Sequence, residues 1–129
     1  MAAPDAFTAD YFEDVAQQTW DGLPQEFQQI VSNLAIQVRD FASRETLNHM
    51  GIGDAYDLLG LYHGVGLPFK SVLDVQPGPD MIFLYRLPIL AYAQASGEPV
   101  ETVIRHVLIH EIGHHFGFSD ADMDAIEAA

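Results

Sequence analysis

Two histidines four residues apart, His110 and His114, lie in a stretch whose apolar spacing predicts one long helix over residues 99–116. Side chains at positions i and i+4 of a helix are about 40° apart around its axis, one turn above each other. Both imidazoles can therefore reach one ion, with each nitrogen about 2.0–2.1 Å from it. The sequence thus predicts a metal site on one face of this helix, and the remaining elements must fold around it.

The motif reads H-E-x-x-H-x-x-G-x-x-D from His110 to Asp120. Gly117 can adopt a positive φ and turn the chain sharply, which would bring Asp120 back as a third ligand. Two histidines and one carboxylate leave a fourth position open for water, as in catalytic zinc sites. We therefore expect Zn²⁺ as the cofactor. The expected ligands are His110, His114 and Asp120, with Asp122 or Asp124 as alternatives for the third.

Glu111 lies on the flank of the face that carries the two histidines. A carboxylate at that position can reach a water on the metal without binding the ion itself, as a general base must. The spacing therefore predicts Glu111 as the catalytic base of a hydrolase. It would take a proton from the attacking water and pass it to the leaving group.

The neighbouring positions of the helix favour a metal site over a packing role for the histidines. Val100, Val103 and Val107 share their face with His110 and His114. Polar groups on an apolar face cost free energy unless they are paired or bind a metal.

Two further histidines of this helix are not expected to be ligands. His115 points about 100° away from His114, which predicts a packing or supporting role. His106 is expected on the opposite side of the helix, at the surface.

Charge and cysteine content exclude several classes of protein. Five Lys and Arg stand against 19 Asp and Glu, a formal charge of -14, so nucleic acid and anionic membranes are not expected partners. The chain has no cysteine, which excludes disulfides, thiol nucleophiles and Cys-containing zinc sites. No secretory leader and no apolar run of about 18 residues is present, which predicts a cytoplasmic protein.

The length of 129 residues and the apolar content of 49% predict a single domain over residues 1–129, with a loose tail at 1–6. Strands are expected over residues 34–38, 72–75 and 81–85, with a loop or hairpin in 54–70. Helices are expected over 8–20, 25–33, 43–50, 88–96 and 99–116, with another turn or two in 120–129. Without β-α-β alternation, this pattern predicts an α+β fold.

Several segments besides the motif helix resemble a known family. They are Leu23-Pro24 with Phe27, residues 58–64 (L-L-G-L-Y-H-G) and residues 79–86 (P-D-M-I-F-L-Y-R). Together with the motif, they make residues 7–120 similar to the small bacterial zincin-like metallopeptidases, which carry a metzincin-type signature. The resemblance implies a minimal zincin-like fold, with a small mixed sheet packed on helices and a long C-terminal H-E-x-x-H helix. It also implies the metal ligands and the base named above.

The function implied by the resemblance is zinc-dependent hydrolysis of peptide bonds, through a zinc-bound water, in a peptide or unstructured protein. Residues 81–85 are expected to be an edge strand that borders the metal cleft, where a peptide can add through main-chain hydrogen bonds. Tyr62, Tyr85 and His63 are the alternatives for stabilising the oxyanion, and packing roles for the tyrosines stay open. The sequence leaves the oligomeric state undecided.

Two departures from the family pattern bear on activity. His63 occupies a position where an acidic residue is common in relatives. Full metzincins also continue after the third ligand into a C-terminal subdomain with a methionine-containing turn. Nine residues follow Asp120 here, and Met123 is too close to it to form that turn. We therefore expect weak peptidase activity. The alternative function is a metal-binding regulatory or interaction protein with a zincin fold and little or no turnover.

Overall fold

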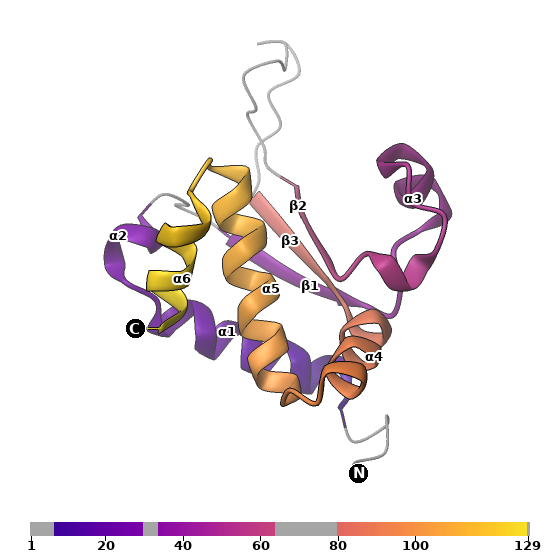
Figure 1. Cartoon of the computed structure of the whole chain (residues 1–129), viewed down its shortest axis with the longest axis horizontal. Helices are drawn as coiled ribbons and strands as arrows, with labels where there is room; N and C mark the ends of the chain where they lie inside the picture. The colour runs from indigo at the N-terminus through magenta and orange to yellow at the C-terminus, as the bar shows by residue number, and fades with distance from the viewer. Residues whose placement is uncertain (1–6, 30–33, 64–79, 129) are drawn as a thin grey trace.

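The computed structural model describes residues 7–29, 34–63 and 80–128 of the chain (Figure 1). Its strands are β1 (Leu34–Arg39), β2 (Gly60–His63) and β3 (Asp80–Tyr85). Its α-helices are α1 (Ala9–Gly22), α2 (Gln25–Gln28), α3 (Arg44–Met50), α4 (Arg86–Ser96), α5 (Val100–His115) and α6 (Asp120–Ala128), and η2 (Ala55–Asp57) is a 3₁₀ helix. The expected α+β class is confirmed.

Most expected elements are present, with one helix shorter than predicted. The helix expected over residues 25–33 ends at Gln28. The expected tail at 1–6 and strand at 72–75 lie outside the described residues. The part of the expected loop or hairpin at 64–70 also lies outside them. No helix within the described part of the chain is long and apolar enough to cross a membrane.

Side-chain caps explain where two helices begin. The Thr8 hydroxyl accepts a hydrogen bond from the Tyr11 backbone N–H at 3.2 Å, directly before α1. The Ser43 hydroxyl accepts one from the Thr46 N–H at 3.1 Å, directly before α3. Such bonds satisfy backbone donors that the first turn of a helix leaves without a partner inside the helix.

The three strands form one mixed sheet in the order β1-β3-β2. β1 runs parallel to β3, with Leu34 opposite Asp80, and β2 runs antiparallel to β3, with Gly60 opposite Leu84. The prediction that residues 81–85 form an edge strand is therefore wrong, because β3 is the central strand. Its run of apolar residues is typical of a strand that is covered on both faces. Among the described strands, β2 is the edge strand that neighbours α5.

The helix α5 lies across one face of this sheet, with α1 beside it (Figure 1). Alternate β3 side chains point to opposite faces, so Ile82 and Leu84 pack among buried residues of α5. Phe83 and Tyr85 instead join a separate cluster around Ala42, Leu47 and Leu58. The core thus holds α5 firmly against β2 and β3, which fixes the position of the motif that α5 carries.

Candidate metal centre

The C-terminal half of α5 carries the predicted ligands His110 and His114. The helix is anchored by fully buried residues on its sheet side, among them Ile104, Leu108 and Ile112. The His110 side chain is 16% exposed, whereas that of His114 is 60% exposed. The buried face of α5 therefore extends as far as His110, whereas His114 lies one turn further along the helix and is open to solvent.

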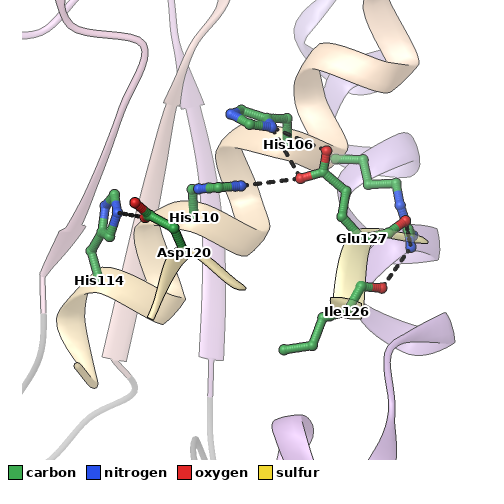
Figure 2. A network of polar contacts seen from close by, with 7 residues as sticks. His106, His110, His114, Asp120, Ile126 and Glu127 are labelled. Atoms are coloured by element: carbon green, nitrogen blue, oxygen red, sulfur yellow. Dashed lines mark hydrogen bonds and ion pairs between the residues drawn. The ribbon is translucent and has the colours of Figure 1, made fainter. Parts of the chain in front are cut away.

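A sharp turn after α5 brings Asp120 back towards His114, as the motif predicts. Gly117 adopts φ +79°, which favours glycine, and α6 begins three residues later. The Asp120 Oδ1 lies 3.9 Å from the His114 Nε2 (Figure 2). These two side chains thus face each other, and both are largely exposed.

His110 faces a different carboxylate. Its Nε2 lies 3.2 Å from the Glu127 Oε1, and the His106 Nδ1 lies 3.0 Å from the same oxygen. The rings of His106 and His110 stack, with their centroids 3.9 Å apart. Among the residues that the structure describes, the metal-ligating group whose donor atoms all lie within 4.8 Å is His106, His110 and Glu127. The predicted trio of His110, His114 and Asp120 is not gathered to that degree.

The expectation that His106 lies on the opposite side of α5 is wrong. Residues 106 and 110 are four apart, so they share a face by the same rule that pairs His110 with His114. His106 is nevertheless exposed, as expected, with 51% of its side chain accessible. The repeat of histidine at every fourth position could have revealed this ladder from the sequence.

Glu127 was not singled out from the sequence, and its position depends on how α6 docks. Met123 on α6 is fully buried against Gly113 of α5. Arg105 donates hydrogen bonds to the backbone carbonyls of Ile126 and Glu127, at 3.3 and 3.0 Å. These contacts hold the last turns of α6 beside α5, which places the Glu127 carboxylate near His110.

Glu111 points away from α6, towards the edge strand β2. A Cβ on Gly60 would lie 3.4 Å from the Glu111 Cγ, so the two residues are in direct contact. The backbone of Tyr62, on β2, faces the Glu111 carboxylate. Burial raises the pKa of the Glu111 carboxyl, and the His114 imidazole and the Tyr62 backbone partly offset this rise. A carboxyl with a raised pKa accepts a proton more readily, as a general base requires.

The sequence that carries this helix, with its histidines and the half-buried Glu111, matches a family of known proteins. Residues 31–129 match the model of the family described as zincin-like metallopeptidase, well over half of the chain. The chain belongs to the zincin-like metallopeptidase family. The resemblance stated from the sequence is thus confirmed. A search of curated proteins found no match.

The residues of this zincin-like chain fit the metal that its family implies. Neutral imidazole and carboxylate are donors that zinc takes in proteins, and α5 and α6 supply both kinds side by side. No cysteine is present to change the preference of the site. The donor chemistry therefore suits zinc or a closely related divalent transition metal.

The three residues considered for oxyanion stabilisation have different surroundings. The Tyr62 hydroxyl donates to the Asp80 carboxylate at 2.5 Å, and its ring stacks on His115 with centroids 4.1 Å apart. Tyr85 is 4% exposed and packs in the cluster with Leu47 and Leu58. His63 is exposed at the end of β2. The two tyrosines thus have packing roles in this zincin-like fold, and His115 packs as predicted.

Gly60 of β2 lies close to Val107 and Glu111 of the motif helix, and we expect Gly60→Ala to destabilise the fold. An added Cβ would lie 2.6 Å from the Val107 Cγ1 and 3.1 Å from the Phe83 carbonyl oxygen. Overpacking of this kind costs about 1–3 kcal/mol. Urea denaturation of the variant and of wild type measures the change in the free energy of unfolding.

Gly53→Ala is the matched control for this substitution, because no atom lies within 4 Å of a Cβ at Gly53. We expect its free energy of unfolding to stay close to that of wild type. Equal stability of Gly60→Ala and Gly53→Ala would show that the tight contact between β2 and α5 is absent in solution.

Proposed function

We propose that this protein is a zinc-dependent metallopeptidase, in which His110, His114 and Asp120 hold the metal and Glu111 is the general base. The observation that carries the proposal is the position of Glu111. Its carboxylate lies between the edge strand β2 and the histidine face of α5, in a chain of the zincin-like metallopeptidase family. The proposed location is cytoplasmic, and the proposed substrates are peptides or unstructured proteins.

The bound metal and Glu111 would have separate roles in peptide hydrolysis. Zinc, when bound, supplies a Lewis acid that polarises the scissile carbonyl and acidifies water. Glu111 accepts a proton from the attacking water and donates it to the leaving amine, so one carboxyl serves first as base and then as acid. The Tyr62 backbone faces the Glu111 carboxylate and helps to stabilise its charged form.

The position of the substrate follows from the sheet order. β2 is the edge strand of the described sheet that lies beside Glu111. An extended peptide could pair with an edge strand through main-chain hydrogen bonds. We therefore expect a peptide to dock along β2 and not along residues 81–85.

A second candidate function is metal binding with little or no turnover, in a regulatory or interaction protein. The exposure of His114 and Asp120, 60% and 89% of their side chains, favours it. Exclusion of water strengthens the electrostatic contribution of a catalytic site, and an exposed site lacks that advantage. The experiment below separates the two functions.

Removal and return of the metal tests the proposed peptidase. We expect the chelator-treated chain to leave an unstructured peptide library intact, and one equivalent of Zn²⁺ to restore cleavage. Asp120→Ala should need more zinc for half-maximal restoration, because the site loses its charged ligand. Asp122→Ala removes the alternative third ligand and should respond like wild type, as should the matched control Asp14→Ala at an exposed position of α1.

Two other results would change the proposed third ligand or the proposed function. If Asp122→Ala rather than Asp120→Ala needs more zinc, the third ligand is Asp122. If the zinc-loaded chain cleaves nothing in the library, the second candidate function replaces the first.

A further inference from the structure

We propose that His106, His110 and Glu127 form a second site for a divalent transition metal such as Zn²⁺. The two sites would share His110, a point that rests on the proposed role of His110 in the peptidase site. Figure 2 shows Glu127 of α6 directed between His106 and His110, while His114 lies further along α5 and faces Asp120 at the start of α6. Nothing in the family motif includes His106 or Glu127.

Two of the three distances within this trio are close to those of ligands around one tetrahedral ion, and all three donor atoms lie within 4.8 Å of one another. Ligand atoms about 2.0–2.1 Å from a tetrahedral zinc ion lie roughly 3.3–3.4 Å from one another. The Glu127 Oε1 lies 3.0 Å from the His106 Nδ1 and 3.2 Å from the His110 Nε2. An ion can therefore enter the trio with small shifts of the side chains.

The trio is also held in place before any ion binds. Hydrogen bonds from Arg105 hold the backbone carbonyls of Ile126 and Glu127, and buried Met123 fixes α6 on α5. The Glu127 and His110 side chains are mostly buried, with 27% and 16% of their surfaces exposed. A preformed donor set binds an ion without first losing the conformational freedom of its ligands.

The proposed two sites exclude each other because both use one ring nitrogen. The His110 Nε2 is the atom that faces Glu127. We infer that the same nitrogen is the ligand that His110 offers to the peptidase site. One nitrogen lone pair binds one metal ion. Occupation of the His106–His110–Glu127 site would therefore withdraw His110 from the peptidase site.

Cobalt titration in a His114→Ala background tests the second site without the first. Co²⁺ is the probe, because its visible absorption reports tetrahedral coordination, and Zn²⁺ displacement gives the competing affinity. We expect His114→Ala to bind one Co²⁺ per chain. Adding His106→Ala or Glu127→Gln should weaken that binding by more than about 100-fold, because losing a direct ligand exceeds the 10–100-fold effect of losing an outer partner.

Two double variants serve as matched controls in the same background. Glu13→Gln removes an exposed carboxylate of α1, and His49→Ala removes an exposed imidazole of α3. Both should bind Co²⁺ like His114→Ala alone. Far-UV circular dichroism before each titration shows that every variant is folded.

Three results would overturn the proposal. The first is no Co²⁺ binding by His114→Ala. The second is equal weakening by Glu13→Gln and Glu127→Gln, and the third is two ions held at once by the wild-type chain. None of these measurements involves peptide cleavage. Co²⁺ binding by His114→Ala would support the second site even if the wild-type chain cleaved no peptide.

Discussion

Glu111→Gln is expected to bind zinc like wild type and to hydrolyse unstructured peptides about 10²–10⁴-fold more slowly, the usual worth of general-base catalysis. The substitution keeps the size of the side chain and removes its basicity. The Gln carbonyl keeps an acceptor oxygen beside the Tyr62 backbone. Because burial already raises the pKa of the Glu111 carboxyl, a neutral amide is not expected to destabilise the fold.

The measurement compares initial rates of peptide cleavage by wild type and Glu111→Gln at equal zinc content. Glu13→Gln, an exposed position of α1, is the control and should cleave like wild type. All three proteins are purified in parallel, so a contaminating protease would appear equally in each. Equal rates for wild type and Glu111→Gln would mean that the activity does not come from this site.

His110→Ala is expected to abolish tight zinc binding, with a loss of affinity of more than about 100-fold. Of the ligands considered, His110 is the one that belongs both to the proposed peptidase site and to the trio with His106 and Glu127. Its loss therefore leaves neither site with two imidazoles. Equilibrium dialysis followed by elemental analysis measures the zinc bound per chain.

His115→Ala is the control from the same helix. The His115 ring stacks on Tyr62 and points away from both groups of ligands, so this variant should bind zinc like wild type. Retention of wild-type zinc affinity by His110→Ala would remove the basis of both sites. A loss of zinc in His115→Ala alone would place the metal near Tyr62 and Asp80 instead.

The local parts of this fold could be predicted because they depend on neighbouring residues. Thr8 and Ser43 mark helix starts through hydrogen bonds to residues three positions later. Gly97 and Gly117 mark helix ends through positive φ. The fold class and the placement of His110 and His114 on one long helix follow from spacing alone, which a single sequence contains.

The errors concern contacts between residues far apart in the sequence. The order of strands depends on which apolar faces meet in the core, and β3 was placed at the edge although both of its faces are buried. Glu127 reaches His110 because α6 folds back onto α5, which no local pattern encodes. His106 is a different kind of error, since its spacing from His110 was available in the sequence.

The contact between Gly113 and Met123 has a consequence for how such sequences can diverge. A Cβ on Gly113 would lie 2.3 Å from the Met123 Sδ, so the two positions share one fixed volume. A larger residue at 113 requires a smaller one at 123, and their separate effects on stability cannot be additive. Position 113 lies inside the motif between its two histidines, while α6 carries Asp120 and Glu127. Positions 113 and 123 are therefore expected to change together during evolution. The buried Met123 limits which residues a descendant chain can place at position 113 of the motif.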